Sequence, residues 1–332
     1  MDTSKKIFVT GSTGFIGSAL VEKLLEQGFR VRALKRNVPT EDRQNLEYIS
    51  GDITDRETLR TGMFGCSSVF HLAAYAKNWS ADPEIYTQVN IEGTKNVFAI
   101  AKELNIERIV WTSTVVTFGP TPPGIVGDET MPRQSSHYFT EYERTKTMME
   151  HEAISWIANG LPLVMVNPTR VFGPGLQSES NAVTKLMDRY RYGSFPFLLN
   201  RGRNIGNYAF IDDVVEGHIL AMERGRIGER YILGGENVSL KELFQTADWI
   251  DGKKRFQMKI FWLAPMLVAH CMQLQAKCFG ISPSFTPGWI RTFLADWAFS
   301  SEKAERELGY TITPFEEALR RTCVWLDKQN KK

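Results

Sequence analysis

The sequence predicts an α/β fold in which a doubly wound parallel sheet carries a smaller, mostly helical and discontinuous lobe. Short β-branched runs alternate with helix-length segments through the first half of the chain, which is typical of a parallel sheet with crossover helices. The 332 residues, 42% of them hydrophobic, suffice for two domains with sizeable cores. The alternation breaks after Pro174, where we expect the lobe to begin.

Six strands and four helices can be placed in order. We expect strands at residues 6–10, 30–34, 46–50, 68–72, 108–112 and 163–167. Helices are expected at residues 16–27, 55–63, 92–104 and 142–158. With right-handed crossovers these elements form a doubly wound sheet, and such sheets bind ligands at the carboxyl ends of their strands.

The second half of the chain is predicted to contribute segments to both the sheet domain and the smaller lobe. Residues 1–174 and 208–236 are assigned to the sheet domain, and residues 175–207 and 237–330 to a substrate-binding lobe. The apolar stretch at 260–274 is interrupted by Pro265 and His270, and it is shorter than the ~20 residues that cross a bilayer. We interpret it as a helix packed in the core, in preference to a cover for the pocket or a contact with a membrane surface.

Charge and cysteine content exclude several classes of protein. The 40 Lys and Arg and 38 Asp and Glu nearly cancel and are scattered, which argues against a nucleic-acid partner. The four cysteines are too widely spaced for a metal or redox pair and too few for a disulfide framework. The apolar run at residues 7–9 is too short for a signal peptide. We therefore expect a cytoplasmic chain without a metal or a transmembrane segment, as a monomer or a homodimer.

A glycine-rich motif, Thr10–Gly17, lies between the first strand and the first helix. Gly11 permits a tight turn, Gly14 lets the backbone approach a pyrophosphate, and Gly17 lets helix and strand pack closely. The free N–H groups of the helix N-terminus favour phosphate. This context predicts a dinucleotide site of the Rossmann type, contacted by Gly11, Thr13, Gly14, Phe15, Ile16 and Gly17.

The second strand ends in Lys35 and Arg36, where a site for NAD would hold an acid against the ribose 2′-hydroxyl. Two cations there favour a 2′-phosphate, and Arg36 matches phosphate geometry best. We therefore expect NADP(H) in preference to NAD(H). Further cofactor contacts are expected at the ends of the third and fourth strands, from Asp52, Ile53, Ala73 and Ala74, whereas His71 is read as a core residue.

Tyr142 and Lys146 lie four residues apart on one face of a predicted helix. A neighbouring ammonium stabilises the anion of a tyrosine, so the pair can serve in acid–base chemistry, and Lys146 can also hold the nicotinamide ribose. Thr114 follows the fifth strand and brings a hydroxyl to the same sheet edge, with Ser113 beside it as the fallback.

These segments together resemble the extended short-chain dehydrogenase/reductase family, and most closely its dihydroflavonol reductase-like and hopanoid-associated epimerase-like branch. The resemblance rests on residues 10–17, Asp52, 71–74, Thr114, Tyr142, Lys146, 167–174, 211–214 and 301–310. It implies that Tyr142 is the acid–base group, Lys146 its electrostatic partner and Thr114 the hydroxyl that orients the substrate oxygen. It further implies that Pro168 and Val171 pack on the nicotinamide. Many relatives have Ser where this chain has Thr114.

The expected activity is NADPH-dependent reduction of a ketone or aldehyde, with Tyr142 as the proton donor. Aromatic residues after strand ends suggest an apolar or ring-containing substrate, contacted by Tyr75, Trp79, Thr114, Tyr138, Arg170 and Tyr208, with Phe172 and Phe210 nearby. A nucleotide-sugar epimerase is the main rival to this activity, because Arg201, Arg203 and Asn207 could meet a diphosphate. A dehydratase is disfavoured, since Val115 and Val116 follow Thr114 where such enzymes carry Asp-Glu. The same residues are also compatible with a hydroxysteroid-type dehydrogenase. A redox sensor without turnover is disfavoured, because such proteins usually lack a tyrosine–lysine pair.

Overall fold

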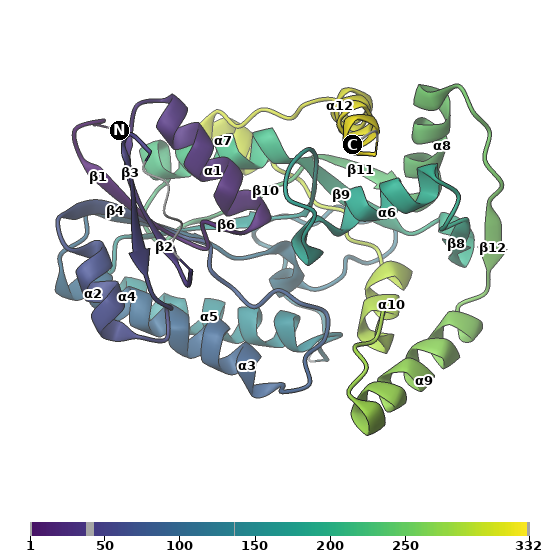
Figure 1. The fold of residues 1–332 in the computed structure, drawn as a ribbon, viewed down its shortest axis with the longest axis horizontal. Coiled ribbons are helices and arrows are strands. Elements are labelled where there is room, and N and C mark those ends of the chain that lie inside the picture. The colour runs from purple at the N-terminus through teal and green to yellow at the C-terminus, as the bar shows by residue number, and fades with distance from the viewer. Residues whose placement is uncertain (1, 38–42, 136, 331–332) are drawn as a thin grey trace.

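The largest sheet of the protein is a seven-stranded parallel sheet (Figure 1). The computed structural model describes residues 2–37, 43–135 and 137–330. The strand order is β10-β6-β5-β4-β1-β2-β3, and every pairing is parallel. The strands are β1 (Lys6–Thr10), β2 (Arg30–Lys35), β3 (Leu46–Ser50), β4 (Cys66–His71), β5 (Arg108–Thr112), β6 (Leu163–Pro168) and β10 (Arg230–Leu233). The predicted fold class is confirmed, and six of these strands lie within two residues of their predicted bounds.

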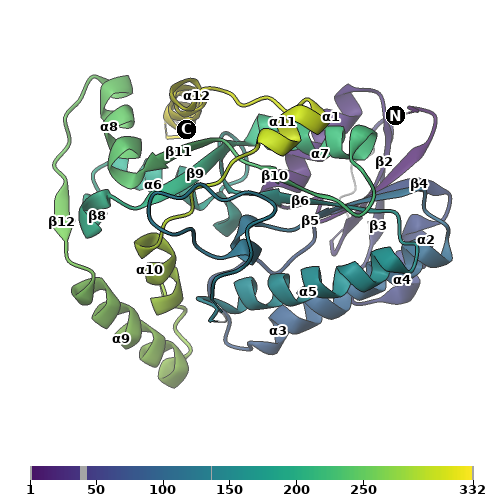
Figure 2. The ribbon, with the colours of Figure 1, turned by 180° about the vertical axis from the view of Figure 1, so that it is seen from behind.

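Helices cover both faces of this sheet (Figures 1 and 2). One face carries α1 (Phe15–Glu26), α7 (Ile211–Arg224) and α11 (Glu302–Leu308); the other carries α2 (Arg56–Met63), α3 (Glu84–Thr87), α4 (Thr94–Glu103) and α5 (Glu141–Ala158). Side chains of β1 alternate between the two layers, so that Ile7 and Val9 join one buried cluster and Phe8 joins the other. A π-helical turn at Gln88–Gly93 precedes α4.

The remaining elements form a smaller part of mostly helical content. A three-stranded sheet has the order β11-β9-β7, and β12 pairs with β8. The strands are β7 (Arg170–Phe172), β8 (Phe197–Leu199), β9 (Ile205–Phe210), β11 (Glu236–Ser239) and β12 (Met258–Ile260). The helices are α6 (Ala182–Arg191), α8 (Leu240–Asp251), α9 (Leu263–Phe279), α10 (Pro287–Leu294) and α12 (Phe315–Gln329). The chain returns to the main sheet at α11, which packs on α7 and β10. The predicted residue bounds of two domains stay a prediction.

The prediction that the apolar stretch at 260–274 packs in the core is wrong. Most of it lies in α9, where Ala269 and Ala276 are buried but Leu267 and Leu274 are 59% and 63% exposed. The physical reason is that α9 rests on α10 along one narrow face and presents its other sides to solvent. Within the described residues, no helix combines the length and apolarity that crossing a membrane requires.

Candidate active site at the carboxyl edge of the sheet

The turn between β1 and α1 has room only for glycine at two of its positions. Gly11 has a φ of +71°, and a Cβ there would lie 2.6 Å from the backbone nitrogen of Ala73. A Cβ on Gly17 would lie 2.1 Å from the carbonyl oxygen of Gly11. Helix α1 therefore starts directly against the turn, close to the end of β4.

The N-terminus of α1 is open to an anion. Gly14 is the N-cap residue, no side chain caps the first N–H groups, and the first turn contains no acid. Orphan N–H groups and the positive end of the helix dipole suit a pyrophosphate. The cradle thus fits a dinucleotide, with Thr13 exposed at its rim and Phe15 buried behind it.

The end of β2 presents cations beside this turn. Ser12 Oγ donates a hydrogen bond of 2.9 Å to the carbonyl oxygen of Leu34, which ties the turn to β2. Lys35 places its Nζ 4.3 Å from the ring centroid of Tyr48, and Arg36 is exposed. The arrangement suits a negatively charged group at the far end of the cofactor cradle.

The ends of β3 and β4 adjoin the same turn. Asp52 Oδ1 accepts hydrogen bonds from the backbone nitrogen and Oγ1 of Thr54, whereas Asp55 is the residue that caps α2. His71 is fully buried between the hydroxyls of Thr10 and Thr94, at 2.7 and 3.1 Å. Burial, aided by the charge of Lys146, lowers the pKa of His71 to about 3. His71 is thus the hydrogen-bonded core residue that the sequence suggested, and Ala73 and Ala74 follow it, partly exposed.

Tyr142 and Lys146 lie in the first two turns of α5, which Thr140 caps by accepting a hydrogen bond from the Glu143 nitrogen. Burial raises the pKa of Tyr142 to about 12, although a hydrogen bond with Thr114 favours the anion. Lys146 is 1% exposed, and its Nζ donates to the carbonyl oxygen of Thr112 at 2.8 Å. Burial lowers the pKa of Lys146 to about 7, against the pull of Glu150. The pKa values of Tyr142 and Lys146 therefore both differ from their ordinary values, as those of catalytic acids and bases often do.

A buried network that sequence reasoning did not assign holds this set in place. The Asn167 amide nitrogen donates to the carbonyl oxygen of Thr114 at 3.0 Å and to Glu150 Oε1 at 2.6 Å. Glu150 in turn pairs with Arg230 at 3.5 Å. Ser113 is buried, and its Oγ has no hydrogen-bond partner among the described residues. Asn167 opens the segment 167–174 on which the family resemblance rests, but the sequence pattern assigns it no role of its own.

The predicted substrate residues are distributed over several environments. Arg170 stacks over Phe293 of α10 at 4.9 Å, and its guanidinium donates to Tyr208 Oη at 3.5 Å. Tyr75 packs edge-on against Tyr86 at 4.9 Å, and Trp79 is half-buried. Phe172 and Phe210 are buried against each other, while Pro168 and Val171 are buried near the end of β6.

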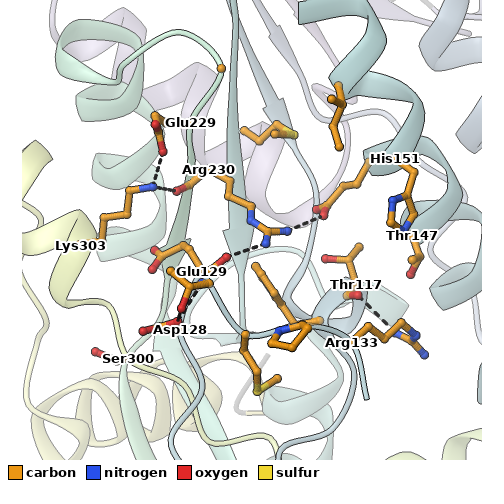
Figure 3. Close-up of a pocket in the computed structure, with 18 of the residues that line it drawn as sticks. Thr117, Asp128, Glu129, Arg133, Thr147, His151, Glu229, Arg230, Ser300 and Lys303 are labelled. Carbon is orange, nitrogen blue, oxygen red and sulfur yellow. Dashed lines mark hydrogen bonds and ion pairs between the residues drawn. The ribbon is translucent and has the colours of Figure 1, made fainter. Parts of the chain in front are cut away.

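Tyr138 lines a different cavity, of about 1240 Å³, which borders α5 (Figure 3). The guanidinium of Arg133 lies 4.5 Å from the Tyr138 ring centroid. Figure 3 shows the pairing of Lys303 with Glu229 at 2.7 Å in this cavity. Tyr142, Lys146 and the glycine turn do not line this cavity, whereas Glu150 and Arg230 of the buried network do. The roles predicted for individual site residues stay predictions.

Comparison with known proteins finds matches along most of the chain. The model of the NAD dependent epimerase/dehydratase family matches residues 7–234. A protein named putative dihydroflavonol 4-reductase from Synechocystis is 33% identical, covering 96% of this chain and 93% of the relative. A 2-alkyl-3-oxoalkanoate reductase of Stenotrophomonas maltophilia is 31% identical (95% and 98% covered), and sterol demethylase protein B of Methylococcus capsulatus is 29% identical (96% and 97%).

Solved structures show the same fold. The crystal structure of gox2253 superposes with a TM-score of 0.82 at 35% identity, covering 98% of this chain and 99% of the other. UDP-glucose 4-epimerase of Thermotoga maritima gives a TM-score of 0.78 at 22% identity, over 98% and 99% of the two chains. At that lower identity the second likeness bears on the fold alone.

Proposed function

Because the chain belongs to the NAD dependent epimerase/dehydratase family, we propose that it is an NADPH-dependent reductase of a ketone or aldehyde on an apolar or ring-containing small molecule. At the level of reaction class, the chain is an NAD(P)-dependent oxidoreductase. The observation that carries the proposal is the placement of Thr114, Tyr142 and Lys146 at the edge where the cofactor cradle also opens.

Each side chain has a distinct task in this reaction. Bound NADPH supplies the hydride, and the cradle of Gly11, Gly14 and Gly17 would hold its pyrophosphate. Tyr142 is kept as a neutral phenol by burial, so it can donate a proton to the substrate oxygen as that oxygen gains charge. Thr114 orients the same oxygen through its hydroxyl. Lys146, whose pKa is about 7, can exchange a proton at neutral pH and stabilise the Tyr142 anion that remains.

The preference for NADPH rests on the end of β2. Lys35 and Arg36 lie there without an acid in the strand end, so a 2′-phosphate would gain charge-assisted hydrogen bonds. The preference for an apolar substrate is supported by Phe293 and Tyr208, which flank Arg170. The names of two relatives, an alkyl-oxoalkanoate reductase and a sterol demethylase protein, agree with such a substrate class.

Nucleotide-sugar epimerisation is the second candidate, because the family includes such enzymes and Arg201 and Arg203 remain near the lobe surface. Asn207, however, does not support it. Its amide is buried and donates to the carbonyl oxygens of Gly235 and Phe299 at 2.8 and 3.0 Å, so it is occupied in holding the lobe together. A hydroxysteroid-type dehydrogenase would use the proposed chemistry in the oxidative direction.

A turnover panel tests the proposal. The purified protein is incubated with NADPH or NADH and with aromatic ketones, alkyl oxo-acids, steroids or nucleotide sugars, and both cofactor consumption and product are measured. We expect consumption of NADPH with at least one apolar carbonyl compound, and loss of that activity in Tyr142→Phe. Conversion of a nucleotide sugar without net consumption of cofactor would establish the second candidate instead.

A further inference from the structure

The segment 252–295 is the most unusual part of the molecule in composition. It contains none of the 38 acidic residues of the chain and six of the basic ones, Lys253, Lys254, Arg255, Lys259, Lys277 and Arg291. The rest of the chain therefore carries 34 bases against 38 acids. The slight positive charge of the whole protein thus arises from one contiguous segment that is itself strongly cationic.

The same segment exposes a large apolar surface. Half of the large hydrophobic side chains exposed in the described part of the protein lie between residues 256 and 281, namely Phe256, Met258, Phe261, Trp262, Leu263, Leu267, Val268, Leu274, Phe279 and Ile281. Scattered exposed apolar residues need no explanation, but ten of them gathered in one short stretch of chain indicate an interaction surface. We call residues 252–281 the apolar arm.

Within the apolar arm, α9 turns its apolar side away from the protein. Its buried Ala269 and Ala276 lie two helical turns apart, on the side that packs on α10. Leu267, Leu274 and Cys278 lie on the exposed sides. Figures 1 and 2 show α9 at the periphery of the molecule, away from the main sheet. A 17-residue helix extends for about 25 Å, so its exposed surface can lie along a flat partner.

The cations of the apolar arm are available to a partner. Arg255 is paired with Asp248 and Asp251 at 2.9 and 2.5 Å. The side chains of Lys253, Lys254, Lys259 and Lys277 are exposed and form no ion pair or hydrogen bond with the described residues. Exposed aromatic and aliphatic groups beside free lysines, without acids, complement an anionic lipid surface.

We propose that the apolar arm docks the protein on the surface of an anionic lipid bilayer, with α9 lying in the plane of the interface. A second copy of the chain fits this face less well, because symmetric pairing through it would bring the same free lysines together across the contact. Binding to a bilayer needs no partner acid in the protein, since lipid phosphates supply the negative charge. The proposal is independent of the reaction that the enzyme catalyses.

The position of α10 gives this docking a consequence for the active site. Phe293 of α10 stacks on Arg170, and the Arg170 guanidinium also donates to the carbonyl oxygen of Thr292. The helix that supports α9 therefore also touches a predicted substrate residue. Docking through α9 would bring the part of the active site that contains Arg170 toward the bilayer, where apolar substrates dissolve.

Co-sedimentation of the full-length protein with lipid vesicles tests the proposal without any substrate or cofactor. One set of vesicles contains phosphatidylcholine alone and the other contains phosphatidylcholine with phosphatidylglycerol. We expect partition into the anionic vesicles, weaker binding to the neutral ones, and a decline as salt rises and the charges are screened. Equal binding to both sets, or binding to neither, would overturn the proposal.

Matched variants identify the surface. Leu274→Asp should weaken vesicle binding by at least about tenfold, whereas Ile154→Asp, at a site on α5 that is 62% exposed, should leave it unchanged. Lys254→Gln with Lys259→Gln should weaken binding on the order of twentyfold, at about fivefold for each lysine. The matched control for this double variant is Lys241→Gln with Lys328→Gln, which changes two lysines outside the apolar arm. Equal losses in the arm variants and their controls would overturn the assignment.

Light scattering on the same samples reports the competing occupant. The wild-type protein could form a dimer that dissociates in Leu274→Asp and fail to bind anionic vesicles. That result would show that a second copy covers the apolar arm, and it would overturn the proposal. Circular dichroism of each variant checks that its fold is intact. Because the readout is binding to lipid, failure of the docking proposal is distinguishable from failure of the proposed reductase activity.

Discussion

Lys146 of α5 donates a 2.8 Å hydrogen bond to the carbonyl oxygen of Thr112, which is the last residue of β5. The ammonium also lies 4.5 Å from the ring centroid of Trp111. Water is excluded here, and the resulting desolvation accounts for the low pKa of Lys146. Burial of this cation is unfavourable for folding, and strongly shifted pKa values of this kind often gather at functional sites.

Lys146→Met should separate stability from activity. Wild-type Lys146 has a pKa of about 7 in the folded protein against 10.5 in the unfolded chain. Between these values the unfolded chain binds the additional proton, so the wild-type free energy of unfolding should rise with pH by up to about 1.4 kcal/mol per unit. The Met variant should lack this rise and lose at least about a hundredfold in turnover. Urea titrations from about pH 7 to pH 9 measure the difference; parallel curves for the two proteins would contradict it.

Gly17→Ala should damage both the fold and the cofactor cradle. The new Cβ would lie 2.1 Å from the carbonyl oxygen of Gly11, so backbone must move, at a cost of about 1–3 kcal/mol. Gly14→Ala is the matched control for stability, since its Cβ would lie 3.2 Å from the same oxygen. Chemical denaturation should show the larger loss for Gly17→Ala. An equal loss in the two variants would mean that the turn adapts freely.

Thr114 should tolerate serine but not valine. Serine keeps the hydroxyl, whereas valine keeps the shape and removes the hydrogen bond to Tyr142. We expect Thr114→Ser to retain most of the turnover and Thr114→Val to lose about 10- to 100-fold, with cofactor affinity unchanged in both. If Ser113 were the active hydroxyl, Thr114→Val would stay active and Ser113→Ala would not.

Cofactor preference should follow the charge at the end of β2. Each charge-assisted hydrogen bond to a 2′-phosphate contributes roughly 1.5–3 kcal/mol, so NADPH should bind about tenfold more tightly than NADH, or better. Lys35→Asp with Arg36→Asn should narrow or reverse this ratio, and rising salt should narrow it in the wild type. Fluorescence titration of both cofactors measures the affinities. Equal wild-type affinities would indicate that Lys35 and Arg36 only face solvent.

The fold could be predicted from sequence because its signals are local. The run Lys6–Thr10 and the glycines after it fix strand, turn and helix within a few residues, and β1 and β3 lie at their predicted bounds. The spacing of Tyr142 and Lys146 likewise identifies a helix face without reference to the rest of the chain. Local pattern thus predicted the strands and the helix face that Tyr142 and Lys146 share, whereas the catalytic role of the pair stays a prediction.

The environment of α9 and of Asn167 could not be predicted, because it depends on what packs against them. An apolar helix has the same sequence pattern whether it faces a core or lies on a surface, and only the absence of acids in 252–295 distinguishes this one. Asn167 has Glu150 as a partner 17 residues away, across two different elements. Contacts of this kind need the three-dimensional arrangement.

The fate of deuterium from NADPH labelled at the transferable position reports directly on the proposed hydride transfer. With an apolar ketone from the panel, the wild-type protein should deliver one deuterium to the carbonyl carbon for each NADPH consumed, as mass spectrometry of the product reports. Tyr142→Phe should bind the labelled cofactor with unchanged affinity but transfer at least about a hundredfold more slowly. A product without deuterium, or undiminished transfer by Tyr142→Phe, would contradict the account of a reductase with Tyr142 as its acid.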